Sequence, residues 1–154
     1  MVRRVAYEVD GWGVGELVFE GEALAWHELP RYASWDDVAR SNHALVKRLR
    51  DYFAGSRDSF ADVQLELSWC TAFQRRVVDA LRSIPYGEAA TYGEVAALAG
   101  HPNAQRAVGS VCAGNRFALV VPCHRVVAAD GLGSYGSLGL PYKQRLLALE
   151  GVTV

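Results

Sequence analysis

Residues 118–127 place reactive side chains inside an otherwise apolar segment, Ala-Leu-Val-Val-Pro-Cys-His-Arg-Val-Val. The nucleophilic form of cysteine is the thiolate, and a histidine oriented by a carboxylate can draw Cys123 into that form. Pro122 fixes a backbone bend just before the thiol. The segment therefore predicts a nucleophile. The alternative is an inert, buried Cys123 beside a surface pair of His124 and Arg125, because free cysteines are commonly buried.

Helix signals precede this segment. Residues 71–74 have the spacing of a capping box and begin an amphipathic helix that ends near residues 85–87. A second capping box starts a short helix over 91–99, and a glycine turn leads into a helix over 103–113. Helix, short turn, helix is the layout of a helix-turn-helix. Many helix pairs share that layout and bind nothing.

A glycine-rich loop over residues 130–139 follows the reactive segment. Its glycines allow close approach of a ligand to the backbone, or simple mobility. Pro141 is predicted to begin the last helix, and Gly151 to stop it after Glu150. A carboxylate is unfavourable at the negative end of a helix, which indicates a dedicated partner for Glu150. An ordinary helix-terminal carboxylate is the alternative.

The first third of the chain predicts antiparallel strands followed by a helix. Three segments rich in β-forming residues are separated by glycine turns: Arg3–Val9, Val14–Phe19 and Ala23–Leu29. Ser34 is predicted to cap a helix that runs to Gly55, with Asp36 and Asp37 near its positive end. Three tryptophans are predicted to be core or interface anchors: Trp12, Trp26 and Trp35.

Composition favours a soluble intracellular protein. The 154 residues are half hydrophobic and contain neither a signal peptide pattern nor an apolar run that could span a membrane. An odd count of three cysteines indicates a reducing compartment with a free thiol, and no cysteine precedes Cys70 to build a metal site with His27 and His43. Residues 1–69 carry a net charge of −4 (8 basic, 12 acidic), and residues 70–154 carry +3 (8 basic, 5 acidic). The basic half is compatible with phosphate contact.

These patterns predict an α/β chain of two domains. Residues 1–62 form a small N-terminal α/β domain with antiparallel strands and a helix. Residues 63–70 form a linker, with a short strand over Val63–Leu67. Residues 71–154 form a mainly helical C-terminal domain that contains the helix-turn-helix and the reactive cysteine.

Seven blocks of the C-terminal domain resemble, in order, the O6-alkylguanine-DNA alkyltransferases, which are DNA-repair proteins. The blocks are Phe73–Val77, Ile84–Glu88, Thr91–Val95, Arg106–Gly109, Gly114-Asn115, Pro122–Val126 and Leu146–Gly151. The resemblance extends from about Thr71 to the C-terminus and is weak before it.

The resemblance implies one irreversible transfer of an alkyl group from guanine O6 to Cys123, without a cofactor or metal. It implies that His124 takes the thiol proton through a water, that Glu150 orients the imidazole and that Asn115 holds two segments of the site together. A thioether is stable and no second thiol is expected to be placed to resolve it. The protein is therefore expected to act once.

The resemblance also implies how the base is held. The Tyr92 hydroxyl would donate toward the ring N3 of guanine, and backbone N–H groups near Tyr135 and Gly136 would meet O6. Carbonyls around Cys123 and Val126 would accept from the exocyclic amine. The loop over 136–140 departs from the family pattern, which puts the range of alkyl groups in question.

The implied partner is double-stranded DNA that carries O6-alkylguanine. The helix over 103–113 would lie in the minor groove, and Arg106 would enter the base stack in place of the flipped nucleotide; a solvated surface arginine is the alternative. Further DNA-binding positions are expected at Thr91, Ala104, Gln105 and Gly109. We expect a cytoplasmic monomer (nucleoid-associated in a bacterium), with side-by-side binding on DNA left open and no membrane partner.

Two other functions fit parts of the sequence. A lesion-binding protein that flags alkylguanine without transfer would share the helices, but relatives of that kind lack the acceptor thiol. A Cys-His hydrolase would turn over and would leave Arg106 unexplained. Cys112 lies on the same helix as Arg106 and is predicted to be structural.

Overall fold

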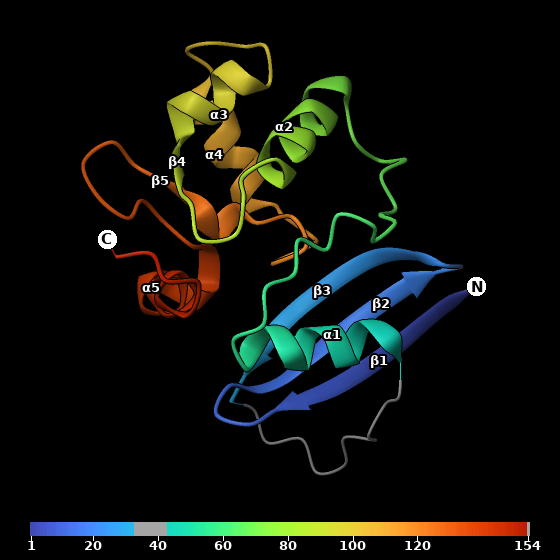
Figure 1. Cartoon of the computed structure of the whole chain (residues 1–154). Helices are drawn as coiled ribbons and strands as arrows, with labels where there is room; N and C mark the ends of the chain where they lie inside the picture. Colours follow the sequence, from blue (N-terminus) through green and yellow to red (C-terminus); the bar gives the residue numbers. More distant parts are fainter. Residues whose placement is uncertain (33–42, 154) are drawn as a thin grey trace.

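The computed structural model describes residues 1–32 and 43–153, and its N-terminal part is a three-stranded antiparallel sheet (Figure 1). The strands are β1 (Val2–Val9), β2 (Gly13–Glu20) and β3 (Ala23–Arg31), in the order β1-β2-β3. Gly11 and Gly21 turn the chain with positive φ angles of 79° and 61°. The predicted strands are confirmed.

Helix α1 (Ala44–Phe53) covers one face of this sheet (Figure 1). His43 caps it, because its Nδ1 accepts a hydrogen bond from the backbone N–H of Leu45 at 3.1 Å. The helix therefore starts later than the predicted cap at Ser34, and the predicted features at Ser34, Trp35, Asp36 and Asp37 lie outside the described residues. The predicted stop at Gly55 is confirmed, with φ of 107°.

The C-terminal part contains α2 (Ala72–Arg82), α3 (Tyr92–Leu98) and α4 (Gln105–Ala113). Both predicted capping boxes are present: Thr71 pairs with Gln74, and Thr91 pairs with Glu94. Helix α4 starts after the predicted residue 103, because the backbone there has a φ of 72°, which no α-helix contains.

The reactive segment forms a short 3-10 helix, η1 (Cys123–Arg125), followed by β5 (Val126–Val127), which pairs in parallel with β4 (Ala90–Thr91). A second 3-10 turn, η2 (Gly136–Leu138), leads into α5 (Gly139–Leu149). The predicted strand over Val63–Leu67 is wrong: Leu65 makes one isolated bridge to Leu24.

Helix α5 begins two residues before the predicted Pro141, which lies in its first turn, where a missing N–H is tolerated. Its predicted end is confirmed. Gly151 has a φ of 83°, its N–H donates to the carbonyl of Ala148, and the N–H of Val152 donates to that of Leu147. This is the hydrogen-bond pattern of a Schellman motif, and it leaves Glu150 at the C-cap.

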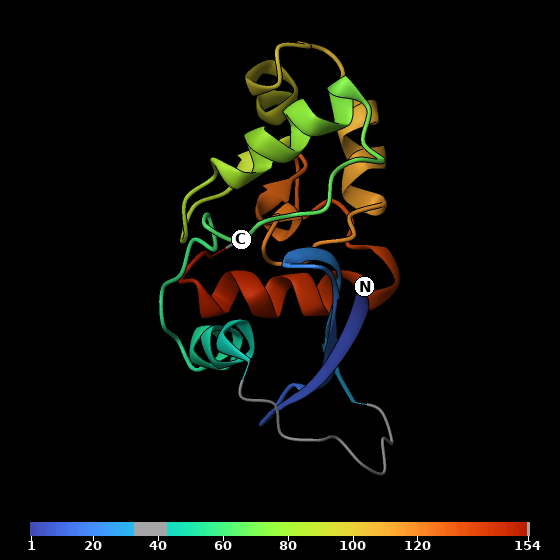
Figure 2. The same ribbon diagram turned by 90° about the vertical axis from the view of Figure 1, so that its right-hand side faces the viewer.

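Helix α5 lies between α1 and the α2–α4 group, so it joins the two parts of the molecule (Figure 2). The Tyr142 hydroxyl donates to the carbonyl of Pro30 at 2.6 Å. The Arg145 guanidinium stacks on Trp12 at 3.6 Å and donates to the carbonyl of Gly11. Trp12 is 7% exposed, as expected of a core anchor.

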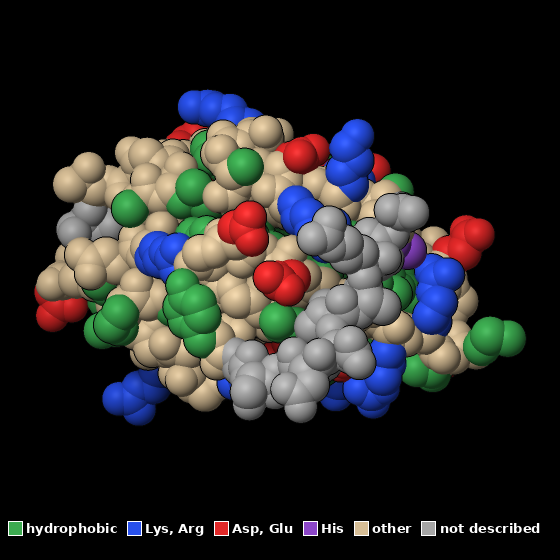
Figure 3. All heavy atoms as spheres, turned by 90° about the horizontal axis from the view of Figure 1, so that it is seen from below, with side chains coloured by type: hydrophobic (Ala, Val, Ile, Leu, Met, Phe, Trp, Pro, Cys, Tyr) green, Lys and Arg blue, Asp and Glu red, His purple; other side chains and the backbone are tan. Residues whose placement is uncertain are grey.

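The face seen in Figure 3 carries interspersed basic and acidic side chains, so charge does not mark it as a surface for a polyanion. Within residues 1–32 and 43–153, no helix is both long and apolar enough to cross a membrane.

Candidate active site

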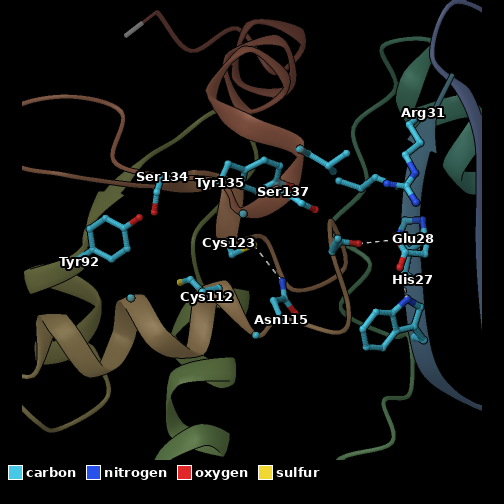
Figure 4. A pocket seen from close by; sticks show the side chains of 18 residues that line it. His27, Glu28, Arg31, Tyr92, Cys112, Asn115, Cys123, Ser134, Tyr135 and Ser137 are labelled. Carbon is cyan, nitrogen blue, oxygen red and sulfur yellow. Dashed lines mark hydrogen bonds between the residues drawn. The ribbon is translucent and has the colours of Figure 1, made fainter.

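A cavity of about 290 Å³ lies between β3, the end of α4 and the loop over residues 134–138 (Figure 4). The Cys123 thiol faces it from η1, with Tyr92 and Ser134 toward one end and Glu28 and Arg31 toward the other. Its volume is near the lower end of the range for small-ligand pockets, roughly 300–1,000 Å³. The cavity therefore has room for a small planar ligand with a short substituent.

The Cys123 thiol is held by Asn115. The Asn115 amide donates to Cys123 Sγ at 3.1 Å and to the Val121 carbonyl at 2.9 Å, while its oxygen accepts from the N–H of Phe117. Cys123 is 7% exposed. Burial raises the pKa of this thiol, although the Asn115 hydrogen bond and the Lys143 charge act in the opposite direction. The thiol therefore needs a base to become a nucleophile.

His124 presents such a base. It is fully buried, and its Nε2 lies 2.8 Å from Glu150 Oε2. An ionised carboxylate only accepts, so Nε2 carries the hydrogen and Nδ1 has the free lone pair. Nδ1 is buried and has no hydrogen-bond partner in the described part of the chain. Burial lowers the pKa of His124 against the opposing effect of Glu150, so the imidazole is neutral and can accept a proton.

Glu150 is held by groups from three segments, which are η1, α1 and the turn at Gly87, whose N–H donates to Oε1 at 3.4 Å. Arg125 clamps it with Nε to Oε1 at 2.8 Å and Nη2 to Oε2 at 3.0 Å, and Arg125 Nη1 donates to the Ile84 carbonyl. The Tyr52 hydroxyl donates to Oε2 at 2.5 Å. Burial alone would raise the pKa of Glu150, but the hydrogen bonds from His124 and Arg125 hold it well below its usual range. The carboxylate is therefore ionised.

Arg125 and Tyr52 were not among the predicted site residues. Arg125 could have been found, because an arginine between apolar residues needs a buried acceptor and Glu150 needed a cation at its helix end. Tyr52 lies in the N-terminal part of the chain, about a hundred positions before Glu150, and no motif surrounds it.

Lys143 ties the cavity loop to the reactive segment. Its fully buried ammonium donates to three carbonyls: Val126 at 2.5 Å, Leu132 at 2.6 Å and Ser134 at 3.1 Å. Burial lowers the pKa of Lys143, and the nearby Cys123 opposes that shift. One lone pair of the Val126 carbonyl is thereby used.

Two tyrosines form further walls of the cavity. Tyr92 is the first residue of α3, and a Cβ at Gly133 would lie 2.9 Å from its hydroxyl oxygen, so only glycine fits there. Tyr135 stacks on Tyr142, and its hydroxyl oxygen is buried without a hydrogen-bond partner among the described residues. Gly136 lines the same wall with a φ of 51°.

The cavity brings together six of the predicted site residues: Tyr92, Gly109, Asn115, Cys123, Tyr135 and Gly136. Three others are buried without lining it: His124, Val126 and Glu150. The remaining predicted DNA-binding residues lie outside it. Arg106 and Gln105 are exposed at the start of α4, Ala104 is half-buried, and the Thr91 hydroxyl caps α3.

Two cavity-lining side chains differ from expectation. Cys112, which we predicted to be structural, lines the same cavity as Cys123. Burial and the neighbouring Cys123 raise the pKa of Cys112 to about 12, which makes it a weak nucleophile at neutral pH. Trp26, which we predicted to be a core or interface anchor, also lines the cavity and is 40% exposed, so it is not part of the core.

A second buried histidine joins β3 to the segment beneath the cavity. His27 Nδ1 donates to the Ala118 carbonyl at 2.5 Å, which makes Nε2 the acceptor for the Tyr7 hydroxyl, also at 2.5 Å. Burial lowers the pKa of His27 to about 4. The sheet is therefore attached to the site by a neutral, fully hydrogen-bonded imidazole.

Comparisons with known proteins agree on one family. Residues 72–152 match the family described as 6-O-methylguanine DNA methyltransferase, DNA binding domain. The methylated-DNA–protein-cysteine methyltransferase of Mycolicibacterium paratuberculosis is 48% identical over 79% of this chain and 72% of its own length. The protein of the same name from Metallosphaera sedula is 36% identical over 98% of this chain and 94% of its own.

The solved structures lead to the same result. The crystal structure of Mycobacterium tuberculosis OGT in complex with DNA is similar with a TM-score of 0.80 and 38% identity, over 96% of this chain and 91% of that one. The similarity therefore extends over the small antiparallel sheet as well as the helices.

Proposed function

The chain belongs to the O6-methylguanine-DNA methyltransferase family, and from that premise we propose that it repairs duplex DNA by moving an alkyl group from guanine O6 to Cys123. It is a methylated-DNA–protein-cysteine methyltransferase, which acts on DNA and accepts the group on its own cysteine. The acceptor assignment is supported by position, because Cys123 faces the cavity with its thiol held by Asn115.

The proton of the thiol passes through a water to His124 Nδ1. The Cys123 sulfur then attacks the alkyl carbon in line, so that an S–C bond forms as the C–O6 bond breaks. The guanine leaves with the electron pair of that bond; a hydrogen bond from the Tyr92 hydroxyl to N3 stabilises its negative charge, and it takes up a proton from solvent. Ionised Glu150 stabilises the imidazolium that His124 has become.

One observation carries this proposal: the buried Nδ1 of His124 has a free lone pair, next in sequence to a thiol whose pKa burial has raised. A protein that only flags the lesion has no use for such a base. A hydrolase would need to release the group again, and Cys112, with its pKa raised to about 12, is a poor group to do so.

Helices α3 and α4 are proposed to act as the helix-turn-helix of a C-terminal domain over residues 71–154, with residues 1–62 as the N-terminal domain. Gly109 and Cys112 place one face of α4 on the cavity, whereas Arg106 is exposed. A helix with its inner face on the base pocket suits minor-groove binding, with Arg106 filling the stack after the base flips.

We further propose O6-alkylguanine as the lesion and a monomer as the acting species. A cytoplasmic location is proposed on the chemistry of the thiols, since Cys70, Cys112 and Cys123 are all free.

The test is the intact mass of the protein after incubation with a duplex that contains one O6-methylguanine. Replacement of the thiol hydrogen by methyl adds about 14 Da, once per chain, if the sulfur is the acceptor. The gain is expected in wild type and in Cys112→Ser and is expected to be absent in Cys123→Ser. Tight lesion binding without any gain in mass would establish a flagging protein instead.

A further inference from the structure

The catalytic carboxylate receives a hydrogen bond from the N-terminal part of the molecule. Tyr52 lies on α1, is fully buried and donates to Glu150 Oε2 at 2.5 Å. The same oxygen accepts from His124 Nε2 at 2.8 Å and from Arg125 Nη2 at 3.0 Å. Tyr52 is thus a partner of the atom that orients the imidazole.

We propose that Tyr52 is a positioning residue for alkyl transfer. Its hydroxyl fixes the Glu150 carboxylate and thereby sets both the direction and the proton affinity of the His124 imidazole. The proposal rests on the proposed roles of His124 and Glu150. It gives the N-terminal sheet and α1 a part in the chemistry, although the reactive residues all lie in the other half of the chain.

The geometry makes this contact distinct from ordinary packing. Oε1 accepts from Arg125 Nε at 2.8 Å and from the backbone N–H of Gly87 at 3.4 Å, and Arg125 Nη2 also reaches Oε2. The Tyr52 hydroxyl adds a third donor to Oε2, the oxygen that His124 uses. Donors that share one oxygen compete for its electron density, so Tyr52 weakens the pull of Glu150 on the His124 proton.

The direction of the effect depends on every titratable or charged group that faces Glu150. These groups are His124 and Arg125 from η1, Tyr52 from α1, Tyr86 from the turn after α2 and Tyr135 from the loop before η2. Lys143 of α5 also acts on His124 and, like Arg125, lowers its pKa. Loss of the Tyr52 hydroxyl leaves these cations in place and strengthens the Glu150–His124 interaction. The protonated form of His124, the imidazolium, then becomes harder to deprotonate.

The experiment measures single-turnover methyl transfer from an O6-methylguanine duplex between pH 5 and 9. In Tyr52→Phe, the acidic limb of the pH–rate profile is expected to shift to higher pH by about one unit. On the acidic limb the rate is expected to fall about tenfold, because a shift of one pH unit changes the fraction of neutral imidazole tenfold there, and the loss is expected to be smaller at neutral pH. The matched control is Tyr142→Phe, which also removes a hydroxyl that joins the two parts of the molecule, here to the Pro30 carbonyl. Its acidic limb is expected to stay at the wild-type position.

A second variant guards against a folding defect. With 3-fluorotyrosine at position 52, the shape of the side chain is kept and the phenol becomes a stronger hydrogen-bond donor. The acidic limb of the pH–rate profile is therefore expected to shift to lower pH. Equal slowing of Tyr52→Phe and Tyr142→Phe with unmoved limbs would overturn the proposal, as would an unmoved limb in the fluorotyrosine protein. Failure of wild type to transfer methyl at all would instead refute the proposed function.

Discussion

Two buried histidines connect different segments of the molecule, and they differ in how many of their ring nitrogens are hydrogen-bonded. His27 joins the sheet to the floor of the cavity, and both of its ring nitrogens are paired. His124 lies in the cluster around Glu150, and one of its nitrogens has no hydrogen-bond partner in the described part of the chain. Burial lowers the pKa of both imidazoles, so both are neutral.

Burial and a shifted pKa therefore do not distinguish the structural histidine from the proposed general base in this protein. The difference is whether a lone pair is left over. The Tyr7 hydroxyl occupies the acceptor nitrogen of His27, which leaves that ring without a free site for a proton. In His124 the carboxylate occupies the donor nitrogen, and the acceptor remains available.

The largest expected effect comes from His124→Gln. Glutamine keeps a donor for Glu150 but offers no base, so the rate of methyl transfer is expected to fall by about 10³-fold, within the 10²–10⁴ typical of general-base catalysis. Single-turnover kinetics with an O6-methylguanine duplex measure it. His27→Gln is the matched control and is expected to transfer at a rate close to that of wild type. Equal losses in the two variants would remove the contrast between the two histidines.

Glu150→Gln is expected to cost stability as well as activity. It leaves the buried Arg125 without its countercharge, and breaking a buried pair in this way costs about 3–4 kcal/mol. Chemical denaturation would measure the free energy of unfolding. The exposed pair of Arg4 and Glu16 provides the control through Glu16→Gln, for which a change below about 0.5 kcal/mol is expected. A comparably small change in Glu150→Gln would show that the cluster is not closed to water.

The paired histidine is expected to make stability depend on pH. His27 has a pKa of about 4 when folded and an ordinary value near 6.5 when unfolded, so the unfolded chain binds more protons between these values. Stability from this group is fully present above pH 6.5 and is lost as the pH falls toward 4, by up to roughly 3 kcal/mol at 1.36 kcal/mol per pKa unit.

Denaturation curves of wild type and His27→Gln from pH 4 to pH 7 isolate this contribution. His124 is present in both proteins, so its own pH-dependent contribution to the unfolding free energy cancels in the difference. The difference in unfolding free energy between the two proteins is expected to shrink as the pH falls. A constant difference over that range would mean that His27 is not buried in neutral form.

The smallest expected effect is that of Tyr7→Phe. The change removes the donor to His27 Nε2 and leaves a buried acceptor unpaired, at a cost of about 1–2 kcal/mol. Tyr32→Phe is the control, because Tyr32 is 80% exposed and its hydroxyl bonds to Gly11 at the surface. Thermal unfolding compares them. A stability of Tyr7→Phe equal to that of Tyr32→Phe would contradict the role given to the Tyr7 hydroxyl.

Local rules predicted most of the helix and strand boundaries. The capping boxes at Thr71 and Thr91 involve neighbours three residues apart, and the glycine stop at Gly151 needs only a positive φ, so both are evident in the sequence. The start of α1 was missed because His43 caps with a ring nitrogen, outside the usual set of capping residues.

The sequence predicted those parts of the site that involve residues close together in the chain or that match the family resemblance. Cys123, His124 and Asn115 lie within nine residues of one another, and the cluster with Glu150 has the expected partners. The contributions of Tyr52 and Trp26 could not be predicted, because they depend on how the sheet and α1 pack against α5 and the cavity. Nothing local to either residue encodes that packing.

Lys143 has a consequence for chemical labelling of the protein. The chain contains two lysines, and the ammonium of this one is fully buried with its three N–H groups bonded to carbonyls. An amine-reactive reagent needs a free, deprotonated amine, so it would leave Lys143 unmodified in the folded protein. Exposed Lys47 on α1 and the amino terminus are then the available attachment points, and a dye or surface linker could be joined there without touching the cavity.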